Sequence, residues 1–286
     1  MLHEFAYHGP TSLEEALRIL KGNGSGTTVF SGGTDLFVNI RAGLVTPEHV
    51  VDLKGIPELH QLSWDDREGL SIGACVTVNQ LLDHPEVVGR FPVLRAAGEE
   101  LATYQLRNRA TVVGNVVTAS PCGDFGSPLL TLGGEVVLAS GEGERRVALG
   151  EFITGVKRTI IRPEEIVTRI VVPVRWAGAS GGYRKLKRIK GHDLGVVSVA
   201  MIRHEGVVRC AISSAAPTPV LLPDFPDDTP VTTIQKKAQE MISPIDDVRC
   251  TREYRAFMVD IYIRRLLEEL GGDAGTSGTT PREASA

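Results

Sequence analysis

The sequence predicts an α+β fold in more than one compact unit, and three features predict it. A helix-forming segment separates two short apolar strands near the N-terminus. β-rich runs divided by Gly and Pro fill residues 111–172, and an apolar hairpin precedes two helices in the last third. A chain of 286 residues is long enough for two or three such units.

The first unit is predicted from one capped helix and two short strands. Thr11-Ser12 and Glu14-Glu15 provide a capping box, and Gly22-Asn23-Gly24 ends the helix that follows. β-branched and aromatic residues then predict strands at 27–30 and 49–53, with a short helix near 36–41 between them. This order of elements indicates a small parallel βαβ layer.

The middle of the chain predicts helices followed by a meandering sheet. Thr77 caps a helix that ends by Pro85, and a longer helix is expected over residues 93–106. The later apolar runs are short and are divided by Gly and Pro, as in consecutive strands. Strands are predicted for residues 69–76, 112–117, 135–139, 145–149 and 165–172.

The last unit begins after a Gly- and Ala-rich segment, residues 176–182, which predicts a domain boundary. Residues 195–203 and 207–213 predict a hairpin, because the turn between them contains Gly206. A proline-rich link over 216–230 leads to helices near 232–242 and 251–270, and the second of these is amphipathic. The tail, residues 271–286, is rich in Gly, Ser, Thr and Ala, and we expect it to be disordered.

The bulk composition excludes several classes of protein. The 31 basic and 35 acidic residues give a net charge of −4, which disfavours a dedicated nucleic-acid binder. We expect no membrane span, because the chain has no run of about twenty apolar residues. The N-terminus lacks the pattern of a secretory signal, so a cytoplasmic location is expected.

The cysteines and histidines predict neither a metal site nor a catalytic residue. Cys75, Cys122, Cys210 and Cys250 lie far apart in the sequence, whereas zinc and iron–sulfur sites use clustered thiolates. The 7 histidines form no metal-binding or catalytic spacing, and no nucleophile–base pair is recognisable. If the protein carries electrons, its own cysteines are not expected to hold the carrier.

The most informative segment is a glycine loop between the first strand and its helix. Glycine adopts φ > 0 without strain and lets a ligand approach the backbone, and exposed N–H groups beside a helix start attract phosphate. The alternative is a plain turn, because short glycine motifs give many false positives. The loop matches neither G-x-G-x-x-G nor a Walker motif, which disfavours a nicotinamide Rossmann domain or an ATPase. Its residues are Val29, Phe30, Ser31, Gly32, Gly33, Thr34, Asp35 and Leu36.

A second glycine-bearing segment follows about eighty residues later, and the two loops together could grip the two ends of one long phosphorylated ligand. Asp124 has two interpretations, a turn or helix-cap residue and an acceptor for ribose or ribityl hydroxyls. The candidate binding residues of this segment are Thr111, Val112, Val113, Gly114, Asn115, Ser120 and Asp124.

A run of cations over residues 184–190, followed by His192-Asp193, is the third candidate. The plain interpretation is a solvated edge strand, since lysine also protects sheet edges from aggregation. The functional interpretation places one or two of these cations near a flavin or its phosphates. A positive charge near the pyrimidine end of an isoalloxazine stabilises the anionic reduced form.

The order of the motifs resembles the FAD-binding medium subunit of molybdenum hydroxylases, the group of carbon monoxide dehydrogenase and xanthine dehydrogenase, over residues 1–270. Residues 31–36 resemble the family loop Ala-Gly-Gly-Thr-Asp-Leu, and residues 111–115 resemble its Thr-x-Gly-Gly-Asn. Residues 119–124 are similar to Ala-Ser-Pro-x-x-Asp and residues 162–173 to the Pro-Gly-Glu-Ile-Leu segment. Residues 183–193 are similar to the Tyr-x-Lys…Arg…Asp strand, and residues 215–219 also fit.

This resemblance implies a two-subdomain FAD-binding fold of the vanillyl-alcohol-oxidase (PCMH) type, followed by a small α+β C-terminal domain. The implied domains are 1–175, with subdomains of about 1–56 and 57–175, and 180–270. Backbone N–H groups of the two loops would cradle the FAD diphosphate, and Asp124 would bind a hydroxyl of the FAD chain. Val167 and Lys185 would lie near the adenine or flavin region.

One residue departs from the family pattern, because Val113 stands where the family usually has a glycine. Either its side chain turns away at a β-compatible backbone angle, or the loop grips FAD less closely. The loops also lack a histidine at the usual covalent-attachment position, so the resemblance implies non-covalent FAD.

The implied role is electron transfer. A molybdenum cofactor on a large partner subunit would hydroxylate the substrate, and [2Fe–2S] clusters on a small partner subunit would deliver the electrons to FAD here. The implied assembly is a dimer of heterotrimers. One alternative is a nucleotide-binding or FAD-binding scaffold subunit without electron transfer, which Val113 favours. Another is a stand-alone flavin oxidoreductase.

Overall fold

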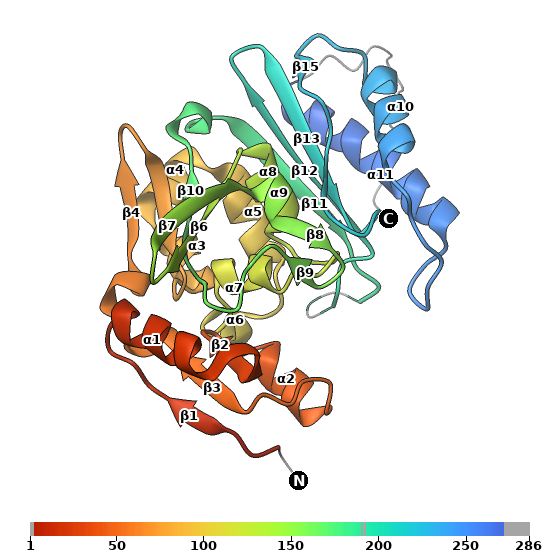
Figure 1. The fold of residues 1–286 in the computed structure, drawn as a ribbon. Helices are drawn as coiled ribbons and strands as arrows, with labels where there is room; N and C mark the ends of the chain where they lie inside the picture. The colour runs from red at the N-terminus through yellow and green to blue at the C-terminus, as the bar shows by residue number, and fades with distance from the viewer. Residues whose placement is uncertain (1–2, 190, 192, 272–286) are drawn as a thin grey trace, which may run out of the picture.

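The computed structural model describes residues 3–189, 191 and 193–271. Three larger sheets, with helices among them, make up most of these residues, and a two-stranded sheet accompanies the second (Figure 1). The predicted disordered tail lies outside the described residues, apart from Gly271. The predicted domain division at 175–180 stays a prediction. Short 3₁₀ helices lie at Gly24–Gly26, Leu53–Gly55, Pro57–His60 and Val174–Trp176.

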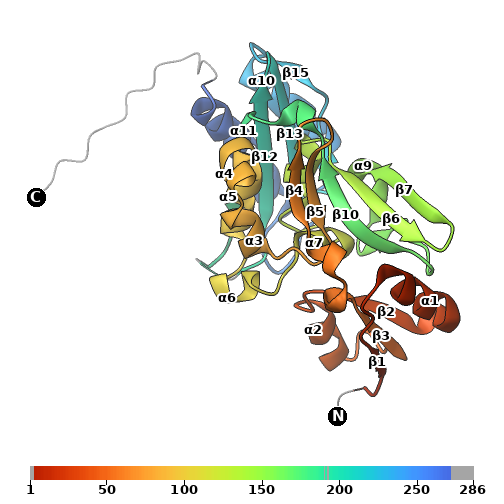
Figure 2. The same ribbon diagram turned by 90° about the vertical axis from the view of Figure 1, so that its left-hand side faces the viewer.

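The N-terminal layer is a small parallel sheet with strand order β1-β3-β2, as the sequence predicts for β2 and β3. Helix α1 begins after Ser12, whose hydroxyl accepts from the Glu15 N–H, and ends before Gly24, which has φ +61°. The layer occupies one end of the molecule (Figure 2). Its elements are β1 (Ala6–His8), α1 (Leu13–Asn23), β2 (Thr27–Phe30), α2 (Leu36–Arg41) and β3 (His49–Asp52).

The second sheet is antiparallel, with strand order β4-β5-β10-β6-β7. The predicted strand 69–76 ends at Gly73. The Ala74 N–H still bonds to Thr168 of the neighbouring strand, but the Cys75 N–H turns to the Leu59 carbonyl and leaves the ladder. A small hairpin of β8 and β9 lies beside it. The strands are β4 (Leu62–Asp65), β5 (Gly69–Gly73), β6 (Glu135–Ser140), β7 (Gly143–Ala148), β8 (Ile153–Gly155), β9 (Arg158–Thr159) and β10 (Ile166–Val172).

Helices fill the space between the second sheet and the third, and they share one hydrophobic core with both. The predicted helix 93–106 is wrong as one element. Ala102 has φ +45°, and the Thr103 hydroxyl caps a new helix by accepting from the Leu106 N–H. The helices are α3 (Val78–Asp83), α4 (Pro85–Arg90), α5 (Pro92–Glu100), α6 (Tyr104–Arg107), α7 (Val112–Val117), α8 (Gly126–Thr131) and α9 (Leu149–Phe152).

The predicted strand over residues 112–117 is also wrong, because this segment forms helix α7. Its valines favour a strand locally, but the surrounding contacts override that preference. Thr111 caps the helix by accepting from the Gly114 N–H at 3.0 Å, and the Thr118 hydroxyl donates back to the Gly114 carbonyl at 2.8 Å. Val112, Val113 and Val116 then pack into the core.

The third sheet carries the predicted hairpin, with Glu205 and Gly206 at positive φ in its turn. The proline-rich link contains two short strands, both paired with β13, that the sequence does not predict. Helices α10 and α11 cover the far face and enclose a second hydrophobic cluster. The elements are β11 (Ser180–Leu186), β12 (Val197–His204), β13 (Val207–Ser213), β14 (Val220–Leu221), β15 (Phe225–Pro226), α10 (Val231–Met241) and α11 (Arg252–Glu269).

Candidate flavin-binding site

A cavity of about 880 Å³ lies where the N-terminal layer meets α7, the start of β10 and strand β11. This volume is in the range of cofactor and ligand sites. Of the 17 predicted binding residues, Val112 alone does not line the cavity, because it is fully buried in the core. Apolar residues that were not among the predicted ones also line the cavity, among them Leu101, Leu106 and Ile166.

The first glycine loop presents unpaired backbone donors to this cavity. Within the described part of the chain, the N–H groups of residues 32–35 make no hydrogen bond. Gly33 has φ +76°, which bends the chain into a concave turn at the start of α2. Consecutive free N–H groups in such a turn bind anions, so the predicted phosphate site has the donors that it needs.

The two loops meet rather than holding opposite ends of a ligand, which differs from the sequence-based expectation. The Ser31 hydroxyl lies 3.4 Å from the Thr111 hydroxyl, and the Thr118 hydroxyl lies 3.5 Å from the Asp35 carboxylate. Gly32 packs so closely that an added Cβ would lie 2.2 Å from the Arg109 carbonyl oxygen. The close approach of these segments therefore requires glycine at position 32.

The backbone of Val113 differs from the first predicted alternative, and the second, a looser grip on FAD, stays a prediction. Its backbone is helical rather than β, and its side chain is only 3% exposed because it packs into the main hydrophobic cluster while bordering the cavity. The side chain is therefore part of the core, and the departure from glycine has a structural reason.

Replacing Val113 with glycine is expected to destabilise the chain by about 3 kcal/mol without tightening FAD binding. Two costs add to this loss of stability: the buried valine side chain is removed, and glycine is less favourable than valine inside a helix. Denaturant unfolding of the FAD-free chain and FAD titration measure the two effects. Val88→Gly on α4 is the matched control, because Val88 is 45% exposed and should cost less than about 1 kcal/mol. Tighter FAD binding by Val113→Gly would contradict this account.

A buried ion pair between the second loop segment and strand β11 forms another part of the cavity wall. Lys185 Nζ lies 2.8 Å from the Asp124 carboxylate, and the Tyr183 hydroxyl donates to that carboxylate at 2.9 Å. Burial raises the pKa of Asp124, and Lys185 and Tyr183 oppose that rise by stabilising the anion. Tyr183 was not among the predicted binding residues, although alternation along a strand puts residues 183 and 185 on one face.

A further part of the cavity wall is formed by residues of the segment 161–167. Of these residues, only Val167 was predicted to contact the ligand. Glu165 holds it in place by accepting from the Arg162 N–H at 2.9 Å and from Arg145 Nε and Nη2 at 2.6 and 2.8 Å. The Arg145 hydrogen bonds keep the pKa of Glu165 below its ordinary value. Such a bidentate pair is geometrically specific, so it fixes the start of β10 at the cavity edge.

The chemistry of the cavity fits a flavin dinucleotide and gives no sign of a metal centre. The unpaired N–H groups suit a diphosphate, and the apolar walls suit the ring systems. Among residues 3–189, 191 and 193–271, no three His, Cys, Asp or Glu side chains cluster as metal ligands would. In the same residues, no helix is long and apolar enough to span a membrane.

Residues 3–175 match the family described as the FAD binding domain in molybdopterin dehydrogenase, and the chain belongs to that family. The carbon monoxide dehydrogenase medium chain of Hydrogenophaga pseudoflava is 28% identical, over 92% of this chain and 96% of that one. The glyceraldehyde dehydrogenase medium chain of Sulfolobus acidocaldarius is also 28% identical, over 93% and 98%.

A solved structure agrees with these sequence matches. Reconstituted CO dehydrogenase from Oligotropha carboxidovorans superposes with a TM-score of 0.88 at 28% identity, covering 94% of this chain and 98% of that one. The predicted fold class and the family resemblance are confirmed. The chain is an FAD-carrying medium subunit of the molybdenum hydroxylase type.

Proposed function

We propose that this subunit holds non-covalent FAD in the cavity and passes electrons through it to an external acceptor. The electrons would come from [2Fe–2S] clusters on a small partner subunit, after oxidation of a substrate at a molybdenum cofactor on a large one. FAD supplies the chemistry that accepts single electrons and delivers pairs, and the protein supplies position and electrostatics. We further propose a dimer of heterotrimers in the cytoplasm.

The free N–H groups of residues 32–35 at the cavity carry this proposal. Together with the start of α7 they would bind the diphosphate of FAD. Asp124 would accept from a hydroxyl of the FAD chain while paired with Lys185, and Val167 would contact a ring system. The relatives carry different substrate names, which agrees with selectivity that lies on another subunit.

The chain is expected to bind one FAD that heat or acid releases. The full chain would be purified, stripped, and titrated with FAD while flavin fluorescence and visible absorbance are recorded. Saturation at one FAD per chain, with all flavin recovered in the supernatant after heat denaturation, is the expected result. A folded chain that stays colourless at high FAD concentration would contradict the proposed site, and flavin that remains on the denatured chain would contradict non-covalent binding.

A further inference from the structure

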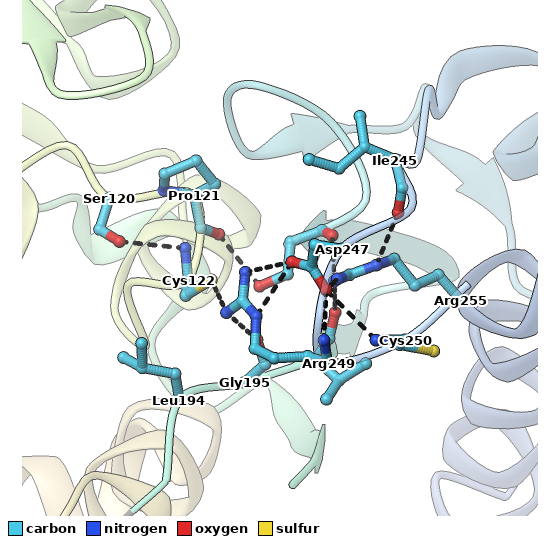
Figure 3. A network of polar contacts seen from close by, with 12 residues as sticks. Ser120, Pro121, Cys122, Leu194, Gly195, Ile245, Asp247, Arg249, Cys250 and Arg255 are labelled. Atoms are coloured by element: carbon cyan, nitrogen blue, oxygen red, sulfur yellow. Dashed lines mark hydrogen bonds and ion pairs between the residues drawn. The ribbon is translucent and has the colours of Figure 1, made fainter. Parts of the chain in front are cut away.

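A polar network connects the cavity wall to helix α11 and the segment before it (Figure 3). Cys122 lies on the cavity wall, two residues from Asp124, and its Sγ is 3.0 Å from Arg249 Nη1. The same guanidinium nitrogen lies 3.5 Å from the carbonyl oxygen of Gly195, two residues before β12. Gly195 itself packs on the Lys185 side chain, since an added Cβ would lie 3.3 Å from Lys185 Cε. Arg249 therefore contacts Cys122, which is close to Asp124 in the sequence, and Gly195, which packs on Lys185.

Arg249 is rigidly held at its other end. Asp247 accepts from Arg249 Nε at 3.0 Å and from Nη2 at 2.7 Å, and its second oxygen lies 2.7 Å from Arg255 Nη2. Arg255 is 1% exposed and also donates to the carbonyl groups of Ile245, Val196 and Ser214. Burial favours the neutral form of Asp247, but the arginine contacts prevail and lower its pKa to about 2.

A second connection joins the same two regions one residue earlier on the wall. The Pro121 carbonyl accepts from the Ser214 N–H at 2.9 Å and from the Ser214 hydroxyl at 3.2 Å. Ser214 has φ +65° and in turn accepts from Arg255 through its own carbonyl. The wall is therefore fixed at Pro121 and at Cys122 by groups that are all anchored on Arg255.

We propose that Arg249 is a positioning residue for FAD, which holds the wall segment 120–124 in its binding arrangement from the C-terminal part of the chain. The inference rests on the proposed FAD site. Arg249 does not need to touch FAD, because a wall that is ordered before binding loses less entropy when the ligand arrives. An arginine suits this task, because its planar guanidinium holds Nε and Nη2 on one Asp247 oxygen while Nη1 faces Cys122, which fixes direction as well as distance.

The test compares Arg249→Met with Arg252→Met in the full chain. Arg252 is the matched control, because it is three residues away, pairs with Asp246 and is 61% exposed. FAD titration is expected to show a Kd about tenfold higher for Arg249→Met and less than twofold higher for Arg252→Met. The visible circular dichroism of bound FAD should change only in Arg249→Met, because it reports the geometry around the ring, which a loss of stability alone would leave unchanged.

Arg249→Lys decides the matter if Arg249→Met fails to fold. Lysine keeps the charge but has no planar guanidinium to contact Asp247 and Cys122 together. The Kd of Arg249→Lys is therefore expected to lie above the wild-type value and below the tenfold increase expected for Arg249→Met. A folded Arg249→Met or Arg249→Lys chain with the wild-type Kd and dichroism would overturn the inference. Failure of the wild-type chain to bind FAD would instead overturn the proposed function.

Discussion

Gly33→Val is expected to purify without FAD and to resist reconstitution. An added Cβ at this position would lie 2.3 Å from Phe30 Cε2 and 3.0 Å from Phe37 Cδ2, so both rings must move. The residue also has φ +76°, which a β-branched side chain rarely adopts. Because the change reorients consecutive N–H donors, two or more hydrogen bonds to a charged diphosphate are lost, and the Kd should rise at least about a hundredfold.

Gly43→Val separates this local effect from general backbone strain. Gly43 has φ +69°, close to that of Gly33, but no atom lies within 4 Å of its added Cβ. Both variants should lose stability from the strained angle, and only Gly33→Val should lose FAD. The measurements are the thermal midpoint of each FAD-free chain and the FAD stoichiometry of each purified one. Stoichiometric FAD in Gly33→Val would remove the first loop from the diphosphate site.

Local sequence features predicted α1, β2, α2 and β3 of the N-terminal layer, because each of these is defined by its own residues, but strand β1 was missed. Strand β2 and helix α2 have the predicted bounds, since β-branched residues and a glycine turn follow one another without competing signals. Helix α7 shows the limit of this approach. Its valines favour a strand, and the contacts of Thr111, Thr118 and the core that make it helical depend on the folded structure.

The site was predicted as a set of segments but not as an arrangement. The glycine loops were recognisable from residue type alone, because φ > 0 and close approach require glycine. Their contact through Ser31 and Thr111 joins residues 80 positions apart, which no local pattern specifies. The pair of Asp124 and Lys185 is likewise 61 positions apart and depends on the packing of β11 against the second loop.

Asp124→Ala is expected to destabilise the FAD-free chain by about 3–5 kcal/mol. The Lys185 side chain is only 2% exposed, so the variant leaves a buried ammonium without its carboxylate, and breaking a buried pair from one side has a cost of this size. The Tyr183 hydroxyl loses its acceptor at the same time. Urea unfolding measures the loss. Glu99→Ala is the control, because Glu99 and its partner Arg95 are 55% and 49% exposed, so about 1 kcal/mol or less is expected.

The double variant Asp124→Ala/Lys185→Met distinguishes a lost charge partner from a lost packing contact. Removing the lysine charge should recover much of the stability, because no unpaired charge is then buried. FAD affinity should not recover with it, since the carboxylate proposed to accept from the FAD chain is still absent and a hydrogen bond of that kind contributes about 1–3 kcal/mol. Restored stability with weak FAD binding would assign Asp124 both roles. Restored stability with wild-type FAD affinity would limit Asp124 to neutralising Lys185 and would remove it from the cofactor site.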